Sequence, residues 1–293
     1  FAVCILSFAF AAGMLRMELH AIYPLQSAQV DSLVAIKDTF VSNLRRVLPE
    51  PHATLLAGLT VGERGFPKDI NEQFRRAGVS HIVVLSGYNL SVVARWLGFL
   101  GPFGATAGII FFTLMTGAEA SAVRAALMAL VIIFAKRTGH VYDAVRALVA
   151  AALLMLLYDP SLLVLNLSFQ LSFLATAGIL FLEPPILRLI MPGLSAGSLR
   201  QSSGRIIKYF AGLLSTTLAA GLAVFPLILF VFGRVSLVGP LVNLLVLPVV
   251  PLLMFLGYTA GLLGFLSSFL TLPLAWLAYP LLAYLLSVVH LFT

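Results

Sequence analysis

Charged residues are scarce in this chain of 293 residues, where Asp, Glu, Lys and Arg together make up 10% of the sequence. An ordinary soluble domain has about 25%. Hydrophobic residues account for 61%, and several continuous runs approach the roughly 20 residues that cross a bilayer as one helix. The composition predicts an all-α, polytopic bundle of transmembrane helices. It excludes a membrane β-barrel, whose strands alternate apolar and polar residues in segments of about ten.

Cysteine and the common catalytic motifs are also rare or missing. Cys4 is the only cysteine, so the chain can form neither an internal disulfide nor a multi-cysteine metal site. The five histidines are scattered without an HExxH pattern, and the sequence has no Walker A loop and no GxSxG elbow. We therefore expect a protein that is not an enzyme and that needs no metal and no cofactor.

The distribution of polar residues divides the chain into three sections. Residues 1–13 are expected to be the end of a first membrane helix, although a run of this length also suits a signal peptide. Residues 14–77 are hydrophilic, and residues 78–293 are expected to form the polytopic domain. Within the hydrophilic section, Val30 to Leu48 has amphipathic spacing, which suits either the membrane surface or contact with another domain. Pro67 is expected to open a short helix over 68–77.

The sequence predicts about 8–10 membrane segments in all. Beyond residues 1–13, the predicted spans are 79–97, 102–116, 119–135, 142–158, 162–182, 207–232, 236–247, 249–265 and 270–291. The segment 236–247 is too short to cross alone, contains Gly239-Pro240 and is followed by Pro248. We expect a broken or re-entrant helix there, which is tolerated where it lies inside protein or faces water.

Basic residues gather in alternate loops, near 136–146 and near 188–208, and at Arg95. By the positive-inside rule these loops are cytoplasmic, so residues 14–77 are expected outside the cytoplasm. Residues 79–293 hold ten basic and four acidic side chains, which account for most of the net charge of +7. Such an excess suits either cytoplasmic loops or an anionic substrate.

One apolar stretch, Gly78 to Ala94, carries more polar side chains than a lipid-facing anchor needs. These side chains are His81, Ser86, Tyr88, Asn89 and Ser91. Polar groups at membrane depth usually face a bundle interior or a watery path. The turn from Ser86 to Asn89 lies near mid-membrane and is the strongest candidate for lining such a path. We interpret Ser86-Gly87 as a bend or a close contact, because nothing around it resembles a nucleophile's triad.

Arg124 places a charged side chain within a predicted span, which costs free energy in a membrane. Glu119 lies about 140° away around the same helix, so we expect Arg124 to bond to another helix or to reach the membrane edge. Asn166 and Gln170 share one face of a later span, and Ser168 and Ser172 share another. These four suit either hydrogen bonds between helices or a pathway lining.

Asn243 lies in the predicted broken segment, between Gly239-Pro240 and Pro248. Discontinuous helices near the membrane midplane often mark transport sites. A helix-capping role suits an asparagine at least as well. The sequence leaves both roles open.

Four stretches, taken in order, resemble the ComEC competence family of inner-membrane DNA-uptake channel proteins. They are Leu56-Ala-Gly-Leu-Thr-Val-Gly-Glu-Arg64; Gly78-Val-Ser-His-Ile-Val-Val-Leu-Ser-Gly-Tyr-Asn89; Ser121-Ala-Val-Arg124 with Asp159-Pro160 and Ser168-Phe-Gln-Leu-Ser-Phe-Leu-Ala175; and Phe225-Pro226 with Leu241-Val-Asn-Leu-Leu-Val-Leu-Pro248. The resemblance covers about residues 53–265. Family members often add an OB-fold domain and a nuclease domain. Residues 14–52 are too few for the first, and no HxHxDH motif follows residue 265.

The resemblance implies a channel domain that passes single-stranded DNA through the cytoplasmic membrane during natural transformation. The residues expected along the DNA path are Ser86, Gly87, Tyr88, Asn89, Arg124, Ser168, Gln170, Ser172 and Asn243. Those expected at the outer mouth, where they attract phosphate, are Arg64, Lys68, Arg75, Arg76 and His81. The implied partners are single-stranded DNA, membrane lipid, a DNA receptor, a nuclease and a cytoplasmic motor protein.

Two other functions remain open on the sequence. The broken segment at 236–248 also suits a secondary transporter of a small anionic or lipid-like solute. A membrane enzyme acting on lipid would need convergent carboxylates or histidines, and only Glu119 and Asp143 come near membrane depth.

Overall fold

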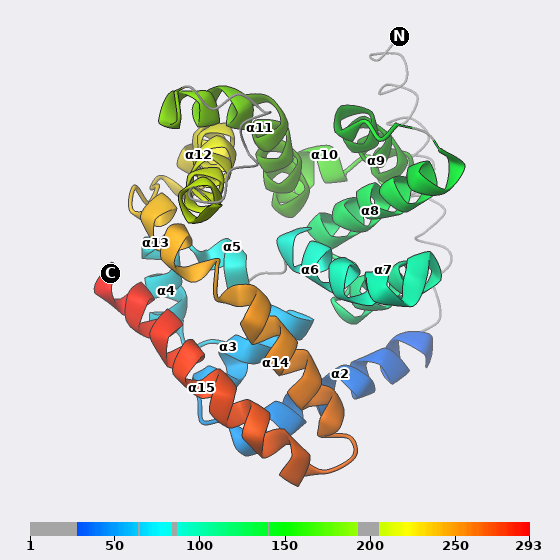
Figure 1. Cartoon of the computed structure of the whole chain (residues 1–293), viewed down its shortest axis with the longest axis vertical. Coiled ribbons are helices and arrows are strands. Elements are labelled where there is room, and N and C mark those ends of the chain that lie inside the picture. The colour runs from blue at the N-terminus through cyan, green and yellow to red at the C-terminus, as the bar shows by residue number, and fades with distance from the viewer. Residues whose placement is uncertain (1–27, 64, 84–86, 140, 193–204) are drawn as a thin grey trace. The chain divides into compact units, whose positions relative to one another are not determined.

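The computed structural model describes residues 28–63, 65–83, 87–139, 141–192 and 205–293 (Figure 1). Throughout these ranges the chain forms helices joined by short connections, without a strand. The predicted all-α fold is confirmed. The chain divides into two compact units, one of Phe1–Asn43 and Leu85–Phe173 and the other of Leu44–Val84 and Leu174–Thr293.

Helix α2 (Ala28–Val47) confirms the amphipathic helix predicted for this region. Phe40, Val41 and Leu44 are buried, while Arg45 and Arg46 are exposed. Val34, on the same helix, is 47% exposed. The helix ends before Pro49, which cannot donate a backbone hydrogen bond.

The first unit packs α6 (Gly87–Leu97), α7 (Gly101–Met115), α8 (Ala120–Thr138) and α9 (Ala144–Tyr158) against one another. The 3₁₀ turn η1 (Gly98–Leu100) joins α6 to α7. Ala120, Met155, Leu156 and Phe169 form a buried cluster. A Cβ built at Gly108 would lie 1.9 Å from Leu97 Cδ1, so the side chain of Leu97 in α6 packs directly over this glycine of α7.

The predicted span 162–182 begins with a break that the sequence analysis missed. Helix α10 (Leu162–Leu165) stops at Asn166, and α11 (Leu167–Ile190) then continues eight residues beyond the predicted end. The Oδ1 atom of Asn166 accepts the backbone N–H of Phe169 at 2.9 Å, which caps α11 and favours a new helix over a continuous one.

The second unit places α3 (His52–Val61) against α14 (Val250–Leu263) and α15 (Ser268–Leu291). Every residue from Ala53 to Val61 is buried. Tyr258 Oη donates to the carbonyl of Thr60 at 2.6 Å and joins α14 to α3. A Cβ at Gly257 would lie 2.7 Å from Thr60 Cγ2 and 2.8 Å from Leu56 Cδ1, so α14 packs closely on α3 at this glycine.

The remaining helices of this unit are α4 (Lys68–Arg76), α5 (Ser80–Val83), α12 (Arg205–Phe232) and α13 (Gly239–Val246). Helix α12 packs on α13, and α13 on α15. Helix α4 follows Pro67 as predicted. A Cβ at Gly178 of α11 would lie 2.6 Å from the carbonyl oxygen of Ala219 in α12, so these two backbones touch.

Three helices of the described chain are long and apolar enough to cross a membrane: Leu167–Ile190, Ile206–Phe232 and Ser268–Leu291. Helices α13 and α14 meet at a bend of 53° and would form a fourth, broken span or a re-entrant loop. The broken helix predicted at 236–247 is therefore confirmed. The apolar helices α3, α7 and α9 and the apolar part of α8 are shorter than the roughly 20 residues of a straight crossing.

Candidate functional site

Arg124 is a buried guanidinium within the first unit. It lies on α8 among small residues, of which Ala120, Ser121 and Ala122 are also buried, and it is itself only 8% exposed. Small neighbours let the long side chain lie along the packed face of the helix. This burial favours a contact inside the unit over a side chain that reaches out to water.

The partner of Arg124 comes from another helix, as the sequence analysis expected. Its Nε donates to Ser172 Oγ of α11 at 2.8 Å, and its Nη1 lies 3.5 Å from Met128 Sδ. The Phe173 ring centroid lies 6.0 Å from Arg124 Cζ, at the outer limit of a cation–π contact. Within the described ranges no carboxylate forms an ion pair with Arg124. A buried cation without a counter-ion costs several kcal/mol, which makes the position unusual for a purely structural residue.

Two of the other polar residues of this region serve local backbone groups. Gln170 Nε2 donates to the carbonyls of Leu163 and Val164, at 2.8 and 3.0 Å, and so closes the end of α10. Asn166 caps α11. Phe169, between them, belongs to the buried cluster of the first unit. The predicted place of Ser168 and Gln170 on a pathway stays a prediction.

The apolar stretch Gly78 to Ala94, with its polar side chains, contains α5 and most of α6. Ser86 lies outside the described residues, and Gly87 and Tyr88 are the first two residues of α6. Asn89 is 1% exposed, so the polar group expected nearest mid-membrane is indeed inside its unit. His81 lies on α5 with an exposed side chain. The place of Asn89 on the DNA path and that of His81 at the outer mouth stay predictions.

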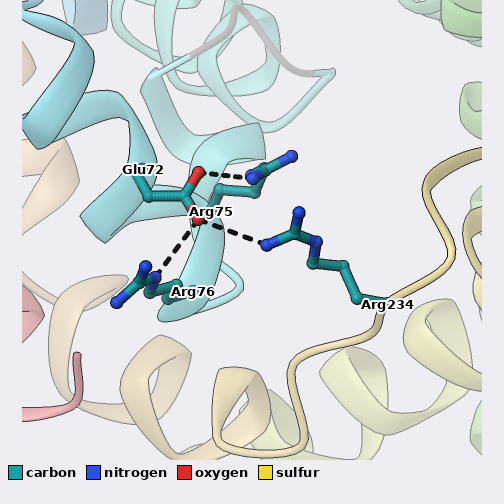
Figure 2. Close-up of polar contacts among 4 residues, drawn as sticks. All are labelled: Glu72, Arg75, Arg76 and Arg234. Carbon is teal, nitrogen blue, oxygen red and sulfur yellow. Dashed lines mark hydrogen bonds and ion pairs between the residues drawn. The ribbon is translucent and has the colours of Figure 1, made fainter.

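A cluster of arginines forms in the second unit around a single carboxylate, as Figure 2 shows. Glu72 Oε2 contacts Arg75 Nη2, while Glu72 Oε1 lies 3.2 Å from Arg76 Nε and 3.4 Å from Arg234 Nη1. We call Glu72, Arg75, Arg76 and Arg234 the arginine cluster. Hydrogen bonding from Arg76, with further contributions from Arg75 and Arg234, lowers the pKa of Glu72 below its ordinary value of 4.5.

Sequence reasoning found Arg75 and Arg76 but missed the other two members. Glu72 stands three and four residues before them, a spacing that brings side chains together on a helix and could have been noticed. Arg234 is separated from Glu72 by 162 residues and carries no such signal. Of the remaining residues predicted at the outer mouth, Lys68 is exposed at the start of α4, and Arg64 lies outside the described residues.

A second contact holds the segment of Arg234 against the end of α4. Gly78 has a φ of +73°, which favours glycine, and a Cβ there would lie 2.8 Å from Ser236 Cβ and 3.0 Å from Gly239 Cα. The chain just after α4 therefore runs directly against the connection between α12 and α13. This close approach explains why a glycine occupies position 78.

Asn243 lies inside α13 and is 5% exposed. Val238 occupies the N-cap position of this helix, so the capping role considered for Asn243 is wrong. Its Oδ1 has no hydrogen-bond partner among the described residues. An unsatisfied buried carbonyl costs about 1–3 kcal/mol, which makes this asparagine a candidate for binding something polar.

The fold and these buried polar groups define a helical protein with segments suited to a membrane and with polar side chains buried inside its units. The chain belongs to the Competence protein family, whose model matches residues 59–293. It is 24% identical over 262 residues to ComE operon protein 3 of Bacillus subtilis, an alignment that covers 83% of this chain and 31% of that protein.

A second relative, the uncharacterized protein YcaI of Escherichia coli, is 23% identical over 255 residues. That alignment covers 77% of this chain and 31% of the relative. The chain therefore spans about a third of the length of the curated relatives that it matches. No solved structure matches it.

Proposed function

We propose that this chain is a multi-pass channel domain of the cytoplasmic membrane that passes single-stranded DNA inward during natural transformation. Membership of the Competence protein family supports a role in DNA uptake. The observation that carries the proposal is the buried guanidinium of Arg124, held by Ser172 and unpaired with any described carboxylate. Such a cation attracts a phosphate and costs free energy when nothing anionic is near.

Asn243 and Asn89 would add neutral polar contacts along the path. A translocated strand needs contacts of this kind, which are weak enough to release it. The domain boundaries at residues 13 and 77, and the placement of residues 14–77 outside the cytoplasm, belong to this proposal. The chain contains no nucleotide-binding motif of the Walker type, so the driving force is assigned to a motor protein. A DNA receptor and a nuclease would act on separate chains or on other parts of the same one.

The test is the flux of fluorescent single-stranded DNA into vesicles that contain the purified protein. Arg124→Gln removes the buried charge and is expected to lower the flux about tenfold or more, equivalent to about 1.4 kcal/mol. Arg146→Ala is the matched control, because Arg146 lies in the same unit with its side chain 89% exposed. Equal flux for the Arg124→Gln variant and the unaltered protein would contradict the assignment.

A secondary transporter of a small anionic or lipid-like solute is a second candidate, favoured by the 53° bend between α13 and α14. Broken helices of this kind often coordinate small solutes. Ion-coupled uptake of a small anion by the same vesicles, without passage of DNA, would favour this candidate over the channel.

A further inference from the structure

We propose that Arg75, Arg76 and Arg234 form a phosphate-binding site whose resident occupant is the carboxylate of Glu72, and that an incoming phosphodiester competes with this carboxylate. The inference deepens the proposed function, on which it rests for the source of the phosphate. It adds Arg234 to the binding residues and gives Glu72 the role of an internal competitor.

The geometry of the arginine cluster supports an anion site. Both oxygens of Glu72 are engaged, Oε2 by Arg75 and Oε1 by Arg76 and Arg234 (Figure 2). Three guanidinium groups around one carboxylate leave a surplus of two positive charges. The two unesterified oxygens of a phosphodiester offer acceptors of the same kind, and guanidinium forks match phosphate well.

The cluster is open enough for a ligand to reach it. The side chains of Arg75, Arg76 and Arg234 are 43%, 60% and 64% exposed, and that of Glu72 is 31% exposed. Ion pairs that are exposed to water stabilise a fold only weakly, so an anion that meets three arginines at once can replace the carboxylate. A strand of successive phosphates has a further advantage, because the neighbouring charges add to the attraction.

The position of Arg234 does not depend on Glu72 alone. The connection that carries Arg234 is packed against the end of α4 through Gly78, Ser236 and Gly239. Arg234 should therefore stay close to Arg75 and Arg76 when the charge of Glu72 is removed. Glu72→Gln therefore tests the effect of the charge alone, since it removes the competing charge and keeps the size of the side chain.

The experiment measures binding to the full chain in nanodiscs of zwitterionic lipid. The probes are a short fluorescent oligothymidylate, inorganic phosphate as its competitor, and a short-chain phosphatidylglycerol as a second competitor. Glu72→Gln is expected to tighten oligothymidylate binding about two- to fivefold, the range that an exposed ion pair spans. Arg234→Ala is expected to weaken it by a similar factor and to lower the salt slope by about one. Arg146→Ala serves as the control.

Weaker or unchanged binding by the Glu72→Gln variant would overturn the competitor role, and unchanged binding by Arg234→Ala would remove that arginine from the site. If inorganic phosphate and phosphatidylglycerol bind while oligothymidylate does not, the phosphate site stands with lipid as its ligand, and the proposed function loses its support. A normal response of this site together with unchanged DNA flux in Arg124→Gln would contradict the role of Arg124 alone.

Discussion

Arg124 and Ser172 form a hydrogen bond of 2.8 Å between α8 and α11, across 48 residues of sequence. The bond gives the Nε–H of a buried guanidinium a neutral acceptor, so the positive charge is positioned without being neutralised. An acidic partner would have stabilised the fold more strongly, but it would also have competed with any anionic ligand.

Replacing Ser172 by alanine should lower the free energy of unfolding by about 1.5–3 kcal/mol, because a charged donor inside the unit loses its acceptor. Ser168→Ala is the matched control, one turn earlier on the same face of α11, and should change stability by less than about 0.5 kcal/mol. Denaturant unfolding in detergent micelles measures both variants. Equal destabilisation by the two would show that the bond contributes nothing specific.

Gly257→Ala should destabilise the protein by about 1–3 kcal/mol, since its new methyl group would overlap Thr60 and Leu56 of α3. Gly221→Ala provides the comparison within α12, where a Cβ meets nothing within 4 Å. There the change should be neutral or stabilise the helix by up to about 1 kcal/mol. Thermal unfolding of both variants tests the prediction, and a neutral Gly257→Ala would contradict the close packing of α14 on α3.

The arginine cluster predicts a dependence of stability on pH. The pKa of Glu72 is lowered in the folded protein from an ordinary value of 4.5, so its contribution is fully present above pH 4.5. As the pH falls below that value the contribution declines, and it is lost once the pH has passed the lowered pKa. The melting temperature of the unaltered protein should therefore fall more steeply below pH 4.5 than that of the Glu72→Gln variant. Parallel curves for the two proteins would argue against the pairing.

Asn243→Leu separates stability from function. The buried Oδ1 of Asn243 has no partner in the described part of the chain, and leucine has a similar size without a polar group. The variant should unfold at the same temperature as the unaltered protein or at a higher one, because the cost of an unpaired polar group disappears. DNA flux should fall if Asn243 borders the path. A clear loss of stability would instead show that the amide has a structural task.

Most of the fold could be predicted from the long apolar runs, because each continuous run favours one apolar helix. The predictions 207–232 and 270–291 differ by only two residues at the start from α12 and α15. The break at Asn166 was missed because a single cap competes locally with an otherwise continuous apolar run. Such competition depends on one hydrogen bond, which leaves almost no trace in the overall pattern.

The candidate site could also be predicted only in part. The direction of Arg124 toward another helix could be predicted, because the angle to Glu119 ruled out the obvious partner on its own helix. Its acceptor Ser172 was recognised as a polar residue, but the bond between them depends on how α8 and α11 pack. Arg234 joins Glu72 through the folding of segments far apart in the chain, so neither spacing nor composition could reveal it.

The burial of α3 has a consequence for the order in which the protein is made. Ala53 to Val61 leave the ribosome well before the helices that cover them, α14 and α15, and the bond from Tyr258 to Thr60 closes a separation of 198 residues. During synthesis this apolar segment must stay covered by lipid or by a chaperone until α14 and α15 have been made. Translation that stops before Val250 would leave α3 permanently without its cover, and the quality-control machinery should recognise the second unit as unfinished.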